Sequence, residues 1–324
     1  MNETKKYLYQ DKLGSTALRN IRISEKTLTL TDLPLPPPGK QGWPWTKAVK
    51  STVRRNFNVL EWPKVSIITP SYNQAQFLEA TIRSVLLQNY YNLEYIIIDG
   101  GSTDDSVKII KKYEKFLSFW VSERDQGQAS AINKGIRQSS GEILGWLNSD
   151  DVYAQGALFH VAKAFSYNPE SIVVHGNRIL INENGEVTGW SQLPSFNPET
   201  SSYNVCSETA FWKRAAMETV GPLNDNLEFA IDLEFFGRLY KHGKFVKLNQ
   251  FLGYFRCHPA SKSSTIAHIG CEEAEREWNK LFGPTDQIIS INYKPSVIQK
   301  LFTLIKHPQE IGSPYLFYRL FRER

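Results

Sequence analysis

The sequence has 324 residues, of which 41% are hydrophobic and 22% charged, and its formal net charge is +5. This length allows one large or two modest domains with a real core, and the composition is that of an ordinary globular protein. The mild positive charge is compatible with an anionic small ligand or a membrane surface, but no dense Lys/Arg patch interleaved with aromatic residues indicates a nucleic-acid binder.

The three cysteines form no CxxC pair, which favours a reducing compartment over a disulfide framework. The first residues, MNETKKYLYQ, lack the apolar core of a signal peptide. No run approaches the roughly 18 apolar residues of a membrane-spanning helix. We therefore expect a cytoplasmic protein, either soluble or peripheral on the inner face of the cell membrane.

Residues 1–62 show little periodicity and are predicted to form an N-terminal extension. The stretch LPLPPPGKQGWPWTK, residues 33–47, is too rich in Pro and Gly for a regular helix or a central strand. We expect an extended arm that lies over the main domain, with Trp43 and Trp45 as anchors.

From Pro63 onward, β-branched apolar runs alternate with segments whose apolar residues recur at helical spacing. Strands are expected at 64–70, 93–102, 117–127 and 142–151, and helices at 77–88, 105–116 and 129–139. This alternation predicts right-handed βαβ units, and therefore an α/β fold with a mostly parallel central sheet flanked by helices.

Each of these strands ends in small, polar or acidic residues. The four ends read TPSYN at 69–73, DGGS at 99–102, ERDQG at 123–127 and NSDD at 148–151. A single acid there could be a helix N-cap, as Asp104 or Asp105 could be. Because ligands bind outside the carboxyl ends of parallel strands, four polar ends in succession favour a site.

The acids Asp99, Asp125 and Asp150 would repel one another if they converged without a partner. A divalent cation, Mg²⁺ or Mn²⁺, on a diphosphate ligand resolves this conflict, since it takes one or two carboxylates together with phosphate oxygens. Acids further from the metal can accept hydrogen bonds from a ribose or a base. No GxGxxG follows the first strand and GxxxxGK[ST] is absent, which disfavours Rossmann-type and P-loop phosphate binding.

Four segments together resemble the opening of a GT-A fold glycosyltransferase of the inverting family 2. They read VSIITPSYNQAQFLEATIRSVLLQ, YIIIDGGSTDDS, SERDQGQASAINKGI and GEILGWLNSDD, and the match covers about residues 65–260. The resemblance implies a glycosyltransferase domain at 63–262, with a nucleotide half at 63–151 and an acceptor half at 152–262. A C-terminal helical extension would follow at 263–324.

The resemblance also implies roles for individual residues. Contacts with the nucleotide of a nucleotide-sugar would come from Thr69, Pro70, Tyr72, Asp99, Asp125 and Ser149. The family's metal-binding Asp-x-Asp motif falls on residues 148–150, where the neutral Asn148 replaces the first acid, so the metal assignment rests on Asp150. His258 lies in YFRCHPASKS, which resembles a late segment of relatives whose His can reach the metal or the diphosphate. The alternative for His258 is a structural histidine.

Four further contacts with the acceptor or the phosphates are expected on weaker grounds. Arg256 and Lys262 could neutralise phosphate, or they could be solvated surface charges. Asp151 could orient a ligand or cap the next helix. Trp212 could stack on a sugar or belong to the core.

The second half of the match carries the expected catalytic base. The segments FWKR, GPLNDNL and AIDLEFFGRL match relatives in order and place Asp232 where the family's base lies. An inverting transfer needs a positioned carboxylate, because the acceptor hydroxyl must lose its proton as it attacks. Glu234 is the rival base, and a first-turn acid beside the helix dipole is the structural alternative for Asp232.

The tail YLFYRLFRER, residues 315–324, has the composition of an interfacial helix, or of a C-terminal helix packed on the domain. We expect an inverting transfer from a UDP-sugar to a saccharide or a lipid-linked saccharide, in bacterial surface-polysaccharide synthesis. One alternative is a catalytically degenerate GT-A-like protein that binds a saccharide or nucleotide. Another is a sugar nucleotidyltransferase, which is disfavoured because the turn TPSYNQAQF has no Gly and no basic residue.

Overall fold

The computed structural model describes residues 6–10, 16–20, 28–49, 62–200, 203, 205–284 and 311. Its strands are β1 (Lys6–Gln10), β2 (Thr16–Asn20), β3 (Val65–Ser71), β4 (Leu93–Asp99), β5 (Phe119–Ser122), β6 (Ile143–Trp146), β7 (Val152–Tyr153), β8 (Ser171–Ile181), β9 (Val187–Ser191), β10 (Ala210–Lys213) and β11 (Lys244–Arg256). Its helices are α1 (Ala75–Leu86), α2 (Ser106–Tyr113), α3 (Gln128–Arg137), α4 (Ala157–Tyr167), α5 (Arg214–Val220), α6 (Ile231–Tyr240), α7 (Lys262–Thr265) and α8 (Ala267–Phe282). Short 3₁₀ turns are η3 (Glu114–Phe116), η4 (Pro198–Thr200) and η5 (Ser207–Thr209).

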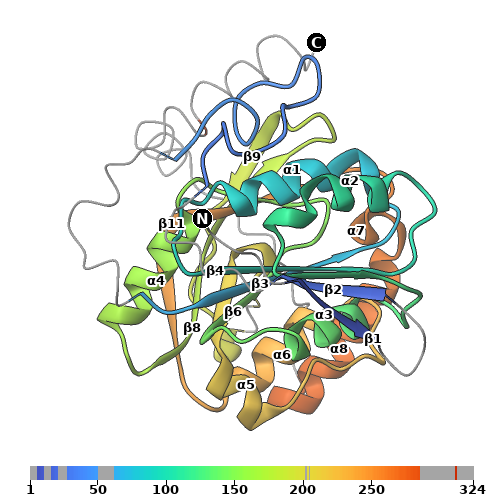
Figure 1. Cartoon of the computed structure of the whole chain (residues 1–324). Coiled ribbons are helices and arrows are strands. Elements are labelled where there is room, and N and C mark those ends of the chain that lie inside the picture. The colour runs from blue at the N-terminus through green and yellow to red at the C-terminus, as the bar shows by residue number, and fades with distance from the viewer. Residues whose placement is uncertain are drawn as a thin grey trace, which may run out of the picture.

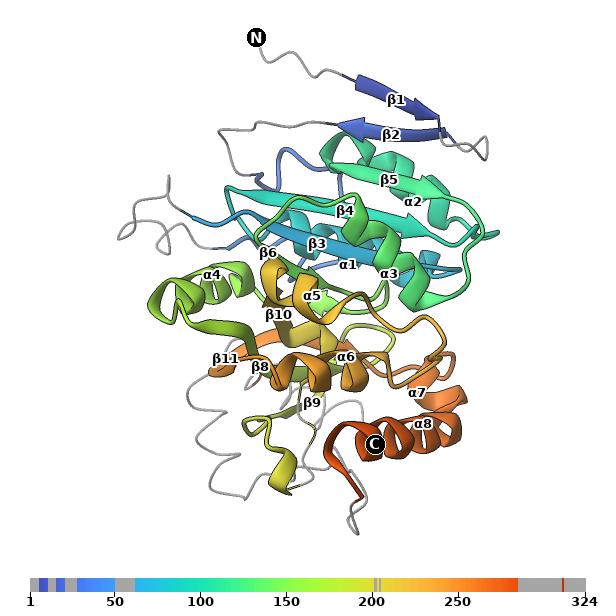
Figure 2. The same cartoon turned by 90° about the horizontal axis from the view of Figure 1, so that it is seen from below.

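The strands form one mixed sheet in the order β1-β2-β5-β4-β3-β6-β10-β8-β11-β7, with β9 paired to β8. Helices α1 and α2 cover one face, and α3, α6 and α8 cover the other (Figure 1 and Figure 2). The prediction of an α/β fold with helices flanking a central sheet is confirmed.

The strands predicted from the alternating pattern are parallel neighbours in the order β5-β4-β3-β6. All of β3 is buried. A strand that is covered on both faces reads as a continuous apolar run, which explains why VSIITPS shows no clear alternation. The second half of the sheet is mixed, because β10 runs antiparallel to both β6 and β8 whereas β11 runs parallel to β8.

Side chains on the two faces of the sheet build two separate apolar layers. Val65 and Ile67 pack with α1, α2 and α4, whereas Ile68 packs with α3, α5, α6 and α8. Trp146 of β6 and Trp212 of β10 lie in the second layer, with ring centroids 5.7 Å apart. Much of the aromatic content is therefore used to fill the core.

The Pro-rich arm at 28–49 lies against α1 and β7. The Trp43 indole N–H donates to the Tyr153 carbonyl oxygen at 2.8 Å. Arg83 of α1 is only 1% exposed. Its guanidinium donates to three arm carbonyl oxygens, those of Pro34, Pro44 and Trp45. These contacts tie the arm to the main domain, and its boundary at residue 62 stays a prediction.

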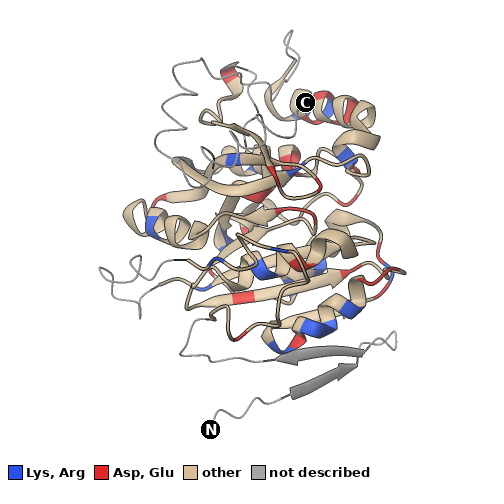
Figure 3. Cartoon of the chain, turned by 90° about the horizontal axis from the view of Figure 1, so that it is seen from above, with Lys and Arg blue, Asp and Glu red and all other residues tan. Residues whose placement is uncertain are grey.

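The tail at 315–324, which was predicted to form an interfacial or packed helix, lies outside the described residues. Among the helices that the structure describes, none has the length and apolar character needed to cross a membrane. Acidic and basic residues are interspersed over the described part of the chain (Figure 3).

Candidate active site

The four polar strand ends meet at one edge of the sheet. Ser71, Asp99 and Ser122 are register partners at the ends of β3, β4 and β5. The Leu147 N–H at the end of β6 donates to the Ile68 carbonyl oxygen at 2.9 Å. The parallel order of the strands therefore brings the predicted residues of the nucleotide half to the same edge.

Asp99 is fully buried and organises the loop that follows β4. Its Oδ2 accepts the backbone N–H groups of Gly101 and Ser102 and the Ser122 hydroxyl, at 3.2, 2.9 and 2.7 Å. Its Oδ1 accepts the Ser102 hydroxyl at 2.6 Å. Both carboxylate oxygens thus have protein donors, and a contact between Asp99 and the nucleotide stays a prediction.

The turn after β3 presents one aromatic ring to solvent. Tyr72 is 62% exposed. Thr69 and Pro70 are buried in β3, and the Thr69 hydroxyl lies 3.1 Å from the Tyr95 hydroxyl. Of the three residues predicted in this turn, Tyr72 alone has a side chain that is open to stack on a flat ring.

Asp125 lies against the backbone of the β4–α2 loop. Its Oδ1 accepts the Gly127 N–H at 2.9 Å. Its Oδ2 would lie only 2.8 Å from a Cβ added at Gly100, so a side chain there would displace the carboxylate. The first glycine of the DGGS segment therefore allows Asp125 and the end of β4 to meet.

Asn148, which stands in place of the first acid of the metal motif, is held by an amide partner. Its Oδ1 accepts from Gln128 Nε2 at 2.7 Å. The Gln128 Oε1 in turn accepts from Lys262 Nζ at 2.9 Å, and this ammonium also donates to the Glu228 carbonyl oxygen at 2.8 Å. The chain of contacts joins β6, α3, α7 and the loop before α6.

Asp150 and His258 form the pair that could hold a metal. His258 Nε2 lies 3.1 Å from Asp150 Oδ2, and their side chains are 2% and 19% exposed. The Phe77 ring packs on the imidazole, with centroids 4.6 Å apart. Within the described residues, no group of three or more His, Cys, Asp or Glu side chains is arranged to hold a metal ion. The donor set fits a cation that draws its other ligands from diphosphate and water.

Arg256 and Asp151 bond to each other and to the backbone beside this pair. Arg256 Nε donates to the Asp150 carbonyl oxygen at 2.7 Å, and its backbone N–H donates to Asp151 Oδ1 at 2.9 Å. Its Nη1 donates to the carbonyl oxygens of Asn182 and Glu183. Asp151 is 1% exposed, and burial, followed by the negative charge of Asp150, raises its pKa well above the usual range. Both residues therefore bond to the protein and hold residues 148–151, called the metal loop after the predicted metal motif, and their contacts with phosphate or acceptor stay predictions.

Asp232 lies in the first turn of α6, whose N-cap is Ala230. Burial raises the pKa of Asp232 to about 7. The Leu233 N–H, which lies 2.9 Å from Oδ1, donates to the carboxylate and by itself lowers this pKa. The negative charge of Glu208 raises the pKa further. A carboxylate that takes up a proton near neutral pH is suited to general-base work.

The rival base is bonded to an arginine. Glu234 Oε1 and Oε2 accept from Arg238 Nε and Nη2 at 2.6 and 2.9 Å. Both carboxylate oxygens are therefore occupied by the guanidinium of the same helix. Glu234 is also only 8% exposed.

The burial of Trp212 contradicts the prediction that this residue stacks on a sugar. The indole is 0% exposed and packs edge-on against Trp146, Phe235 and Phe236. A ring with no exposed face cannot stack on a sugar, so Trp212 is a core residue, which is the alternative considered from the sequence.

A polar stripe on α1 holds the metal loop and was not recognised from the sequence. The Thr81 hydroxyl lies 2.9 Å from the Ser149 carbonyl oxygen and 2.7 Å from that of Asp151. Ser84 Oγ accepts the Tyr153 N–H, and Gln88 bonds to Ala154 O and Leu158 N. The signal was available, because Thr81 and Ser84 are polar residues one turn apart on a helix whose other buried residues are mostly apolar, and Gln88 follows just after that helix ends at Leu86.

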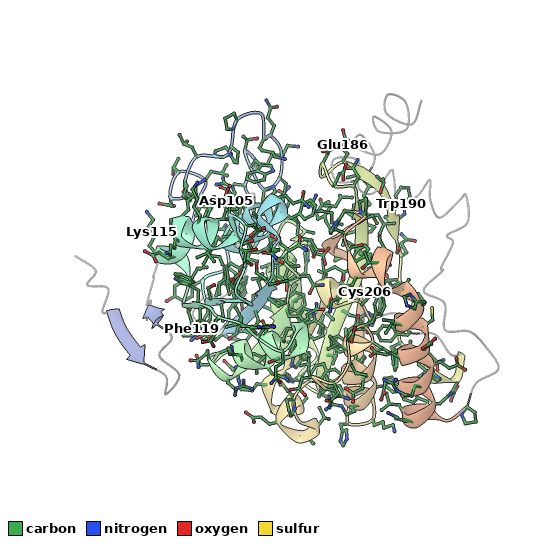
Figure 4. The ribbon with its side chains drawn as sticks, turned by 90° about the vertical axis from the view of Figure 1, so that its right-hand side faces the viewer. Asp105, Lys115, Phe119, Glu186, Trp190 and Cys206 are labelled. Carbon is green, nitrogen blue, oxygen red and sulfur yellow. The ribbon has the colours of Figure 1, made fainter. Side chains whose placement is uncertain are left out.

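A second missed group lies inside the acceptor half. Glu208 of η5 is 2% exposed, and its Oε1 lies 3.6 Å from Arg178 Nη1. Burial raises the pKa of Glu208. Cys206, just before η5, lies in the interior of the molecule (Figure 4). Glu208 and Arg178 form a buried ion pair, the charge of Glu208 raises the pKa of both Asp151 and Asp232, and no linear motif reveals the pair.

Comparison with known proteins identifies the class to which this arrangement belongs. Residues 66–218 match the family model described as "Glycosyl transferase family 2". The uncharacterized glycosyltransferase alr2836 of Nostoc sp. is 26% identical over 226 residues, which are 65% of this chain and 70% of the relative. The PGL/p-HBAD biosynthesis glycosyltransferase of Mycobacterium bovis is 29% identical over 177 residues, 53% of this chain and 68% of the relative.

Two solved structures share the fold. TarS 1–349 of S. aureus in complex with UDP-GlcNAc has a TM-score of 0.54 at 18% identity, over 80% of this chain and 76% of that chain. The mannosyltransferase PcManGT of Pyrobaculum calidifontis in complex with GDP-Man and Mn²⁺ has a TM-score of 0.54 at 17% identity, over 86% of this chain and 76% of that chain.

The chain carries a family 2 glycosyltransferase domain with a GT-A fold, as its sequence motifs indicated, and the protein is a glycosyltransferase. The match to the family model ends at residue 218. Asp232, His258 and Lys262 lie beyond that limit, and their roles stay predictions.

Proposed function

We propose that the protein is an inverting glycosyltransferase that moves a sugar from a UDP-sugar to a hydroxyl of a saccharide or lipid-linked saccharide. The observation that carries this proposal is Asp232, a carboxylate in the first turn of α6 with a pKa raised to about 7. At neutral pH a large fraction of this group is deprotonated, and it is still basic enough to accept a proton from a hydroxyl.

In the proposed reaction the acceptor oxygen attacks the anomeric carbon while the bond to the diphosphate oxygen breaks. Asp232 takes the hydroxyl proton as the new C–O bond forms, and the nucleoside diphosphate leaves. Attack from the side opposite the leaving group inverts the anomeric centre. Positioned general-base catalysis of this kind contributes about 10²–10⁴ in rate.

At the other end of the site, Asp150 and His258 would hold a divalent cation, Mg²⁺ or Mn²⁺. Such a cation supplies charge stabilisation for the leaving diphosphate. The presence of Mn²⁺ with GDP-Man in PcManGT supports this part of the proposal. The exposed ring of Tyr72 would stack on the nucleotide base, while Asp125 and Ser149 would contact the nucleotide from neighbouring strand ends.

The donor and the setting are proposed on the evidence of relatives. TarS was crystallised with UDP-GlcNAc, which favours a uridine nucleotide. The relative named for PGL/p-HBAD biosynthesis comes from a bacterium, as do the glycosyltransferase of Nostoc and TarS. A cytoplasmic enzyme of bacterial surface-polysaccharide assembly, peripheral on the membrane where it meets a lipid-linked acceptor, fits these relatives.

The proposal is tested by calorimetric binding of UDP, GDP and dTDP, first with Mn²⁺ and then with EDTA, to the wild type and to Asp150→Ala. We expect one nucleotide to bind only with the metal, and Asp150→Ala to abolish that binding. If no nucleotide binds under either condition, the donor site is wrong as proposed, and a catalytically degenerate protein becomes the better reading.

A further inference from the structure

The loop that leads into α6 is held by a carboxylate from a distant helix. Glu273 of α8 is 6% exposed and accepts three successive backbone N–H groups. Its Oε1 accepts the Glu228 N–H at 3.0 Å, and its Oε2 accepts the N–H groups of Phe229 and Ala230 at 2.9 and 3.0 Å. Ala230 is the N-cap of α6, and Asp232 follows two residues later.

We propose that Glu273 is a positioning residue for the catalytic base, because its carboxylate fixes the backbone of residues 228–230 and with it the first turn of α6 that carries Asp232. This inference rests on the proposed function of Asp232. It extends the active site to α8, a helix outside the residues that match the family model.

The charge of Glu273 suits this task. The three donors lie just before the N-terminus of α6 and end at its N-cap, where an anion is stabilised by the N–H groups and by the positive end of the helix dipole. Burial alone would raise the pKa of Glu273, but the three N–H donors bring it below the usual range. The carboxylate therefore stays charged at neutral pH, and charged acceptors form stronger hydrogen bonds than neutral ones.

Close packing holds α8 in place over this loop. A Cβ added at Gly270, one turn before Glu273, would lie 2.5 Å from Phe229 Cδ1. A Cβ added at Gly237 of α6 would lie 2.6 Å from Leu281 Cδ1 of α8. Helix α8 thus packs closely against Phe229 of the loop and against Gly237 of α6, and this packing holds Glu273 beside the loop.

The opposite side of the same loop is tied to the metal end of the site. Lys262 Nζ donates to the Glu228 carbonyl oxygen and to Gln128 Oε1, and Gln128 bonds to Asn148. Asn133 of α3 bonds to both the N–H and the C=O of Leu223 at the start of the loop. Arg238 also donates to the carbonyl oxygens of Gly221 and Pro222 at the start of the loop, and Glu273 binds the backbone immediately before α6.

The matched control is Glu277, which is one turn further along α8. Its carboxylate is also buried, at 5% exposed, but it accepts from Arg276 Nε and Lys280 Nζ at 2.9 and 2.8 Å, both on its own helix. A Glu→Gln change at either position preserves the side-chain volume and removes one negative charge. In Glu273→Gln the amide NH₂ group faces backbone donors, so the loop loses at least one of its hydrogen bonds.

The experiment compares the wild type, Glu273→Gln and Glu277→Gln by two measurements. The first is amide hydrogen exchange of residues 224–232. The second is the steady-state release of nucleoside diphosphate from UDP-GlcNAc and from GDP-mannose, with Mn²⁺ present and water as the acceptor. We expect exchange at 228–230 to accelerate about tenfold and kcat to fall about tenfold to a hundredfold in Glu273→Gln alone. The KM of the donor and the binding of the nucleoside diphosphate should change less than about twofold, because the loop does not build the nucleotide end.

The proposal is overturned if Glu273→Gln behaves like Glu277→Gln in exchange and kcat, or if its loss of kcat is matched by weaker nucleotide binding and a lower melting temperature. Failure of the proposed function looks different, because Asp232→Asn would then retain donor turnover. If that variant retains turnover while Glu273→Gln loosens the loop, Glu273 orders a loop but positions no base, and the inference is also wrong.

Discussion

Asp150 in the loop after β6 and Asp232 in the first turn of α6 are both carboxylates, but their surroundings suit them to different tasks. Asp150 is 19% exposed and lies beside His258, which is contributed from 108 positions further along the chain. Asp232 lies in the first turn of α6, and its burial raises its pKa to about 7. The first arrangement suits cation binding and the second suits proton transfer.

Replacing Asp232 by Asn should lower kcat about 10²–10⁴-fold with little change in nucleotide affinity, because only the proton acceptor is lost. Donor turnover and calorimetric binding of the nucleoside diphosphate check this. Glu234→Gln is the control for the rival base, and a larger loss there than at Asp232 would contradict the assignment.

The pH dependence follows from the same group. Asp232 acts as a base only when deprotonated, and its pKa is raised to about 7, so kcat/KM should fall as pH drops below about 7. The expected slope is about tenfold per pH unit on the acid side. A profile that stays flat from pH 7 to pH 5 would exclude Asp232 as the titrating base.

Asn148→Asp restores the acid that the metal motif lacks. Asp can still accept from Gln128 Nε2, which is 2.7 Å from the present oxygen, and it adds a negative charge next to Asp150. We expect Mn²⁺ to bind about tenfold more tightly in calorimetry, since carboxylates are stronger ligands for hard cations than amides. Unchanged Mn²⁺ affinity would show that position 148 does not face the metal.

At the scale of the element, α1 combines two functions on adjacent strips of its surface. Leu78, Ile82 and Val85 pack into the core, while Thr81 bonds to the backbone of the metal loop and Ser84 to the Tyr153 N–H of β7. The hydrophobic periodicity that predicts the helix comes from the first strip. In the sequence, the second strip shows only as polar residues at positions where the periodicity predicts buried apolar ones. The partners of these residues lie about 70 positions away in the chain.

Thr81→Val should destabilise the fold by about 1–3 kcal/mol, because the carbonyl oxygens of Ser149 and Asp151 lose a buried donor without a change in side-chain shape. It should also weaken Mn²⁺-dependent nucleotide binding, since these carbonyls flank Asp150. Urea unfolding and calorimetry measure the two effects. Thr81→Ser keeps the hydroxyl, so it should leave the stability and the nucleotide binding as in the wild type. Gln76→Ala, at an exposed position on the same helix, should change neither property.

At the scale of the whole molecule, segments on either side of the family-matched region complete the structure. The arm at 28–49 lies against α1, which in turn holds the metal loop, and α8 holds the loop before Asp232. Arg83 joins the arm to the domain by donating to backbone carbonyl oxygens, and its guanidinium carbon also lies 5.5 Å from the centroid of the Trp45 ring.

Arg83→Met should release the arm and lower the free energy of unfolding by about 2–4 kcal/mol, because several buried carbonyl oxygens lose their donor. Limited proteolysis should then cut within 28–49 faster than in the wild type. Arg137→Met, at an exposed position on α3, is the control. Equal cleavage rates in the two variants would mean that Arg83 does not retain the arm.

The sequence by itself determined the alternation of strands and helices, the edge at which the polar strand ends meet, and the family to which the domain belongs. These features are local, since a buried parallel strand and the turn after it are written in a few consecutive residues, as VSIITPS and NSDD show. Tertiary structure alone decided the state of each side chain at that edge. Trp212 is buried, Glu234 is paired with Arg238, and Asp99 bonds to its own loop, because burial and hydrogen-bond partners depend on segments that meet only in the folded chain.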